Sequence, residues 1–175
     1  MSFLSKLFSF SSGSNQSNEE ADLELLSPVT GALINIDDVP DPVICERIVG
    51  DGCALIPEND SLVAPCDGVI CRLLTSNSAF AIKSECGAEI YVKFGIGTDF
   101  FSGIGFTALK KIGDSVKAGE EIIKIDMQKI ADSIKTTAVS MIAIKSTADI
   151  DRVTCAGGNA IAGQTPCMWL FLKKN

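Results

Sequence analysis

One lysine, Lys93, closes a β-type run in the segment AEIYVKFGIGT, residues 88–98, directly before a glycine-rich turn. A lysine amine can act as a nucleophile or carry a covalently attached group, so Lys93 is a candidate catalytic or carrier residue. The chain contains no histidine. This absence excludes a Ser-His-Asp triad, an HExxH metal site and an imidazole phosphocarrier.

The seven cysteines lie at positions 45, 53, 66, 71, 86, 155 and 167, and no two of them form a CxxC pair. Disulfide frameworks use even sets of cysteines in short secreted chains, and structural zinc sites need closely spaced thiolates or histidines. We therefore expect buried thiols that act as small apolar side chains in a reducing cytosol. We expect no metal and no cofactor.

Composition indicates a globular protein of one domain. The chain has 175 residues, of which 46% are hydrophobic and 21% are charged, which is enough apolar material for a core. The net charge of −7 and the lack of a lysine and arginine cluster argue against a nucleic-acid partner, because binding to a phosphate backbone needs clustered positive charge.

The N-terminal residues 1–21 are predicted to be a flexible tail. Within MSFLSKLFSF, one helical face carries Phe3, Leu4, Leu7 and Phe8, and a Ser/Asn-rich linker follows. The apolar part is too short for a signal peptide or a membrane span, so peripheral contact of residues 2–10 with the inner membrane face and a frayed tail remain alternatives. We expect a cytoplasmic protein whose folded domain spans residues 22–175.

Short β-type runs recur every eight to twelve residues from about residue 23, separated by Gly, Pro, Asn and Asp. Examples are GALINI, PVICERIVG, CALIPE, AFAIKS, VSMIAIK and MWLFLK. This spacing predicts a mainly β protein, a sandwich or a barrel. One segment, DMQKIADSIKTT, instead predicts one or two helical turns with Asp126 suited to capping.

Two turn motifs are more particular than generic strands. VAPCDGVI, residues 63–70, and KKIGDSVKAGEEI, residues 110–122, are typical of paired hairpins in barrel-sandwich proteins. Gly113 and Gly119 supply backbone freedom at the turns, and Val116, Ile122 and Ile123 are predicted to point inward. Biotinyl and lipoyl carrier domains share this pattern, but neither Lys83 nor Lys93 has the neighbours of an attachment lysine.

Longer stretches narrow the choice of family. The DVPD turn at 38–41, the IVGDG turn at 48–52, the APxDG hairpin at 64–68 and the TP at 165–166 follow one another at matching spacings. In this order they resemble the glucose family of enzyme IIA, a phosphocarrier of the bacterial sugar phosphotransferase system. The resemblance covers about residues 22–175 and implies an antiparallel β-sandwich of the barrel-sandwich hybrid type, with a duplicated hybrid motif and one or two short helices.

The resemblance also implies where the site lies. The family's phosphorylated histidine corresponds to Lys93, the histidine that orients it to Ser78, and a following acidic residue to Gly97. Asp38 and Asp41 match the family's acidic turn. The apolar partner-binding patch of the family maps to the following residues: Ile44, Leu74, Tyr91 and Phe94.

Phosphoryl transfer is not expected at these positions. A phosphate acceptor must be unprotonated near neutrality; histidine titrates near 6.5 and lysine near 10.4. Ser76, Ser78 and Thr98 offer hydroxyls, but without histidine each would need another base, such as a carboxylate or Lys93 itself. We interpret Lys93, Ser76, Ser78 and Gly97 as positions of a degenerate site with no catalytic residue.

The leading hypothesis is therefore an enzyme IIA-like protein that binds or regulates partners without carrying phosphate. By the resemblance, those partners are the histidine-containing phosphocarrier protein, sugar permease domains and regulated enzymes. Lys93 and Gly97 are expected to make the patch more positive and to weaken docking of the basic donor. An active phosphotransferase component with a non-histidine acceptor and a biotinyl or lipoyl carrier are the alternatives.

Overall fold

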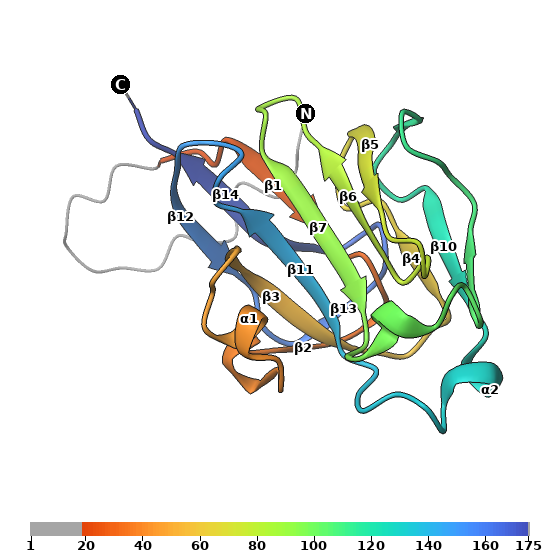
Figure 1. The fold of residues 1–175 in the computed structure, drawn as a ribbon. Coiled ribbons are helices and arrows are strands. Elements are labelled where there is room, and N and C mark those ends of the chain that lie inside the picture. Colours follow the sequence, from red (N-terminus) through yellow and green to blue (C-terminus); the bar gives the residue numbers. More distant parts are fainter. Residues whose placement is uncertain (1–18, 175) are drawn as a thin grey trace.

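A computed structural model describes residues 19–174 of the chain, and these residues form a mainly β structure (Figure 1). The helical elements are η1 (Ile36–Asp38), α1 (Pro42–Cys45), η2 (Thr98–Phe100) and α2 (Met127–Ile130). The strands are β1 (Leu23–Leu26), β2 (Gly31–Ile34), β3 (Gly50–Pro57), β4 (Ser61–Val63), β5 (Gly68–Leu73), β6 (Ala79–Lys83), β7 (Glu89–Phe94), β8 (Phe106–Ala108), β9 (Ser115–Val116), β10 (Glu121–Ile125), β11 (Val139–Ile144), β12 (Ile150–Cys155), β13 (Asn159–Ala160) and β14 (Pro166–Leu172).

The strands form three antiparallel sheets. The large sheet has the order β13-β2-β3-β11-β7-β6-β5-β9, and the two smaller sheets have the orders β1-β14-β12 and β4-β10-β8. In Figure 1 both α1 and α2 lie at the lower end of the molecule, and β7 runs toward that end. The predicted antiparallel β-sandwich with one or two short helices is confirmed.

The two faces of β7 serve different purposes because side chains alternate along a strand. Val92 and Phe94 point into the main core, which also contains Phe80 of β6 and Met141 of β11. The opposite face carries Lys93. A smaller apolar cluster covers part of that outer face; it consists of Ile36, Val39, Ile44, Ala54 and Ile142.

Residues 34–48 therefore form a cover over the outer face of the sheet, and part of this cover was predicted incorrectly. The run PVICERIVG was expected to be a strand, but Pro42–Cys45 forms α1. The reason is local: the Asp41 carboxylate accepts a hydrogen bond from the Val43 backbone N–H at 3.0 Å, and Pro42 lies in the first turn, where its missing N–H is harmless.

The segment after β10 contains the expected helical turn, α2. Asp126 occupies the position before the helix but makes no capping hydrogen bond with its side chain. Its carboxylate instead lies 3.1 Å from the Lys129 ammonium. The predicted helix is thus correct in position, whereas the predicted cap is wrong.

The two hairpin motifs pair with each other across β5 and β9, where Gly68 lies opposite Val116. Gly113 and Gly119 have φ angles of 96° and 88°, which side chains with a Cβ rarely adopt. Val116, Ile122 and Ile123 are buried, as predicted. The hairpin glycines therefore have a structural role.

The predicted tail lies outside the described residues, apart from 19–21, so its amphipathic segment at 2–10 stays a prediction. Within residues 19–174, no helix has the length and apolar composition needed to span a bilayer.

Candidate functional site

Lys93 forms an ion pair that the sequence analysis missed. Its Nζ donates to Oδ2 of Asp99 at 2.8 Å. The Lys93 side chain is only 10% exposed, whereas that of Asp99 is 40% exposed. Lys93 therefore lies mostly inside the protein, and the carboxylate of Asp99 offsets its positive charge, so the expectation of a patch more positive than in the family stays a prediction.

A tight turn brings Asp99 back over the end of β7. Gly95 and Gly97 have φ angles of 71° and 78°, so the chain reverses direction within a few residues. Thr98 is fully buried, and its Oγ1 donates a hydrogen bond to the Phe94 carbonyl oxygen at 2.8 Å. The turn is thereby fixed in the conformation that directs the Asp99 carboxylate to Lys93.

Tyr91 lies two residues before Lys93 and so faces the same side of the sheet. Burial, together with the negative charges of Asp99 and Asp41, raises the pKa of its phenol to about 12. The phenol is consequently neutral at physiological pH. Because the charges of Asp41 and Asp99 both act on the phenol, the three side chains lie near one another.

The two serines of the predicted site are buried beside each other. The hydroxyls of Ser76 and Ser78 lie 2.8 Å apart and form a hydrogen bond. Ser78 has no exposed surface, and Ser76 has almost none. Among the hydrogen bonds of residues 19–174, none joins either hydroxyl to Lys93 or to a carboxylate. The serines are thus packed as small polar side chains, without a base that would activate them.

The acidic turn and the apolar patch are only partly accessible. Asp38 is exposed, Asp41 is half-buried and caps α1, and Leu74 is half-buried after β5. Ile44 is buried within the cover formed by residues 34–48. Phe94 has no exposed surface, because its position in β7 directs it into the main core against Phe106. Its assignment to a partner-binding surface is wrong.

Two residues of this region escaped the sequence analysis. Asp99 follows Gly97 by two positions, and Phe100 comes next with 90% of its surface exposed. The glycines at 95 and 97 could have predicted both residues. Two glycines this close together favour a tight turn, and such a turn brings the residues that follow it back to the end of the preceding strand. The sequence interpretation considered only Gly97 as the position of the missing acid and did not consider the carboxylate of Asp99.

The cysteines fulfil the expectation only in part. Cys53, Cys66 and Cys167 are buried, three others are half-buried, and Cys155 is exposed. All seven are free thiols. Among residues 19–174, no group of three or more His, Cys, Asp or Glu side chains is arranged to hold a metal ion. Cys155 is therefore the exception to the prediction of buried apolar thiols.

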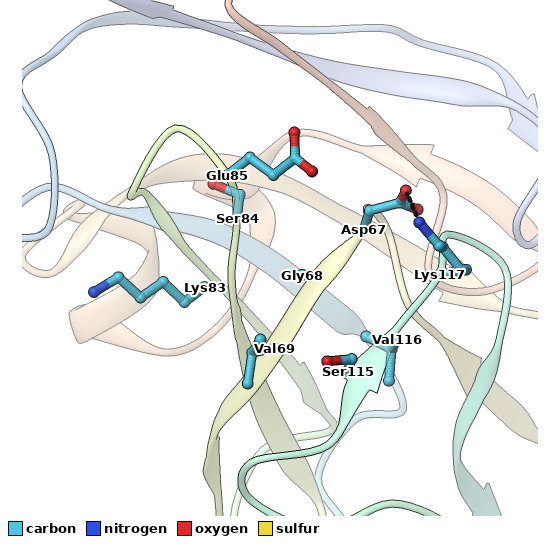
Figure 2. A pocket seen from close by; sticks show the side chains of 9 residues that line it. All are labelled: Asp67, Gly68, Val69, Lys83, Ser84, Glu85, Ser115, Val116 and Lys117. Carbon is cyan, nitrogen blue, oxygen red and sulfur yellow. Dashed lines mark hydrogen bonds and ion pairs between the residues drawn. The ribbon is translucent and has the colours of Figure 1, made fainter.

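A separate hollow of about 470 Å³ lies where the two hairpin motifs meet β6 (Figure 2). Its nine lining residues are Asp67–Val69, Lys83–Glu85 and Ser115–Lys117, and none belongs to the predicted site. The Lys117 ammonium lies 3.0 Å from the Asp67 carboxylate, which also accepts the Ala118 backbone N–H at 2.9 Å. In Figure 2, Lys83 extends away from this pair. The ion pair fastens one hairpin to the other.

Neither lysine considered for a carrier lies in a hairpin tip. Lys83 is the last residue of β6, and Lys93 lies within β7 in its ion pair with Asp99. An attachment lysine must extend freely into solvent to carry a swinging arm. The buried position of Lys93 is unsuited to that role.

The described residues define the class of antiparallel β-sandwich proteins with a candidate site at the end of a central strand, β7. Residues 23–149 match the family described as "phosphoenolpyruvate-dependent sugar phosphotransferase system, EIIA 1". Because this match spans most of the described chain, the protein belongs to that family.

Individual relatives agree with the family assignment. The chain is 37% identical over 174 residues to the glucose-specific EIIA component of Haemophilus influenzae, covering 99% of this chain and 100% of that protein. It is 38% identical over 147 residues to the N-acetylglucosamine-specific EIICBA component of Escherichia coli, covering 82% of this chain and 22% of that protein. The structure of glucose permease IIA from Mycoplasma capricolum superimposes with a TM-score of 0.78 at 26% identity, covering 83% of this chain and 94% of that one.

Proposed function

We propose that this glucose-type EIIA protein does not carry phosphate and acts as a protein-binding, regulatory module. The observation that carries the proposal is the chemistry of Lys93: in a chain without histidine, the residue at the acceptor position is an ammonium group paired with Asp99 at 2.8 Å. An amine that donates its protons to a carboxylate has no free lone pair with which to accept a phosphoryl group.

The surroundings support the same proposal. The hydroxyls of Ser76 and Ser78 are buried and bonded to each other, so they offer no accessible substitute acceptor. An incoming phosphoryl group would also meet the carboxylate of Asp99, and two negative charges at close range repel each other. A phosphotransferase component with a serine acceptor is therefore the weaker alternative.

Exposed apolar residues favour a role in partner binding. Phe100 on η2 is 90% exposed, and Val43 on α1 and Ile48 after it are also exposed. Both segments lie at the lower end of the molecule, where β7 ends (Figure 1). Exposed aromatic side chains are enriched at the centres of protein interfaces. The fused EIICBA relative makes a sugar permease domain the favoured class of partner.

The first experiment tests phosphate acceptance directly. The protein is incubated with phosphoenolpyruvate, enzyme I and the histidine-containing phosphocarrier protein, and bound phosphate is measured under neutral and acid conditions. We expect no incorporation, while the Haemophilus influenzae relative serves as the positive control. Transfer at a rate near that of the control would overturn the proposal, and mass spectrometry of the product would locate the alternative acceptor.

A second experiment tests whether the protein differs from an active EIIA component only in its site residues and still has a donor-binding surface. Lys93→His combined with Ser78→His, with and without Gly97→Asp, is expected to gain phosphate acceptance if the donor surface is intact. Gly97 has open space around its Cβ position, but its φ of 78° favours glycine, so aspartate there is mildly strained. Lys117→His is the matched control, since it adds an exposed histidine remote from the site. Failure of the folded restored variants would mean that the donor-binding surface has also diverged.

A binding experiment tests the regulatory part. Phe100→Ala is expected to weaken binding to the organism's glucose-type permease domains by roughly tenfold or more, as is typical of a central aromatic contact. Ile112→Ala removes another exposed apolar side chain, 60% exposed, in the turn before β9 and is the control. Equal affinities for both variants and the unmodified protein would contradict the role of this end of the molecule.

A further inference from the structure

Three cysteines from distant parts of the sequence meet at one place in the fold. Cys53 lies on β3 of the large sheet, Cys155 ends β12, and Cys167 lies on β14 of a smaller sheet. β12 and β3 are in contact, so the two sheets approach each other there. Cys53 and Cys167 are buried, and Cys155 is exposed. One exposed cysteine and one buried cysteine therefore lie near each other and line the same pocket.

A pocket of about 390 Å³ gives access to this pair. Cys53 and Cys155 both line it, together with Arg47 and Asp51, whereas Cys167 does not. The Arg47 guanidinium donates to Asp51 at 2.8 Å and also binds Asp37 of η1. A small polar reagent can thus reach Cys155 from a cavity that Cys53 also lines, beside the guanidinium of Arg47 and its two carboxylate partners.

The electrostatics of the pair favour a thiolate on the accessible member. The nearby Cys53 thiol lowers the pKa of Cys155, and the positive charge of Arg47 adds a smaller effect in the same direction. Burial and the charge of Asp51 oppose this effect without reversing it. For Cys53 the pKa is raised, by its interactions with Cys155 and Cys167 and by burial. This arrangement is that of a nucleophilic thiolate with a neutral thiol beside it.

We propose that Cys155 is a peroxide-reactive thiol and that Cys53 is its resolving partner, so that the pair forms a reversible disulfide joining β12 to β3. No other cysteine offers the same combination of exposure, a neighbouring thiol and a shared cavity. The proposal is independent of the phosphate chemistry at Lys93.

The chemistry balances with hydrogen peroxide as oxidant. The Cys155 thiolate attacks one peroxide oxygen, the O–O bond breaks, and the departing hydroxide takes a proton to become water; Cys155 is left as a sulfenic acid. Cys53 then loses its proton and attacks the sulfenic sulfur, the S–O bond breaks, and a second water leaves as the S–S bond forms. Two thiols are oxidised and one peroxide is reduced. Two molecules of a small thiol such as glutathione reduce the protein disulfide by two successive exchanges and leave as their own disulfide, which restores both cysteine thiols.

Cys66 and Cys86 provide an internal comparison. They are also near each other, with Cys66 buried and Cys86 half-buried. Burial raises the pKa of Cys66 to about 12, and the charge of Cys86 adds to this effect. The Cys86 thiol lies 3.2 Å from the Ser84 hydroxyl instead of against a positive side chain. The two pairs therefore differ in the groups that surround the more accessible thiol.

The test uses the full chain, reduced and then exposed to hydrogen peroxide, followed by alkylation and peptide mass mapping. We expect the Cys53–Cys155 disulfide to form first. Cys155→Ser should abolish it, and Cys86→Ser should leave it unchanged. In the reduced protein, iodoacetamide should modify Cys155 roughly tenfold or more faster than Cys86, because the thiolate is the reactive form.

Three results would overturn the proposal: formation of a Cys66–Cys86 disulfide first, a dimer linked through Cys155, or equal alkylation rates for Cys155 and Cys86. Cys155→Ser changes an exposed side chain and so leaves the core intact. With Cys53→Ala, we expect dimedone to trap a sulfenic acid at Cys155. If that variant does not fold, free thiols are counted after peroxide treatment instead. The unmodified protein should then lose two thiols and Cys155→Ser should lose none.

Discussion

Two lysine–aspartate pairs in this protein have nearly the same geometry and very different surroundings. Lys93 and Asp99 are 2.8 Å apart, and Lys117 and Asp67 are 3.0 Å apart. The Lys93 side chain is 10% exposed, whereas the Lys117 side chain is 77% exposed. An exposed ammonium that loses its partner is hydrated at once, but a buried one is not. Burial, more than distance, therefore decides how much each pair matters to stability.

The largest effect is expected for Asp99→Ala. This change leaves the mostly buried Lys93 ammonium without its carboxylate, and we expect the free energy of unfolding to fall by about 1–3 kcal/mol, measured by urea denaturation at neutral pH. Lys117→Ala removes the exposed partner of Asp67 and should have a much smaller effect. Equal losses in the two variants would show that burial does not distinguish the pairs.

Lys93→Met should cost less than Asp99→Ala, within about 1 kcal/mol. Methionine keeps the length of the apolar stem, and Asp99, at 40% exposure, can be hydrated when its partner is removed. A double-mutant cycle with Asp99→Ala measures the coupling between the two side chains. A larger cost for Lys93→Met than for Asp99→Ala would contradict this asymmetry.

Tyr91 reports on the carboxylate of the buried pair. As the only tyrosine of the chain, it should titrate near pH 12 in absorbance measurements, and Asp99→Ala should lower that value because the charge of Asp99 helps to raise it. Since the unfolded phenol loses its proton near pH 10, stability should decline as the pH rises from about 10 toward 12. Asp67→Asn is the control and should leave the titration unchanged.

The smallest effect is expected for Asp67→Asn in the exposed pair. The hydrogen bond from the Ala118 N–H, and then that from Lys117, lowers the pKa of Asp67 below 3.8. The native carboxylate is therefore favoured at pH values above 3.8, and its contribution is lost as the pH falls through the lowered pKa. The small difference in Tm between Asp67→Asn and the unmodified protein should vanish in strong acid and shrink at high salt. A difference that persists at low pH would mean that the charge of Asp67 is not its source.

Much of the fold could be predicted because it depends on local patterns. Runs of apolar residues separated by glycine and aspartate indicated the strands, and Gly113 and Gly119 were correctly placed in turns. The error at Pro42–Cys45 arose because the apolar residues there suit a strand as well as a helix, and the Asp41 cap decided for the helix. The misplacement of Phe94 was avoidable, since alternation along β7 puts Phe94 and Lys93 on opposite faces.

For the site, the residue types could be predicted from the sequence, but their contacts could not. The sequence by itself determined that no imidazole is available, because residue types are independent of folding, and its resemblance to the glucose family of enzyme IIA led us to expect Lys93 at the acceptor position. The tertiary structure alone decided that Asp99 neutralises this lysine and that Cys53 and Cys155 meet beside Arg47. Both outcomes depend on distances in space: a glycine turn returns Asp99 to β7, and packing of β12 on β3 joins thiols far apart in the chain.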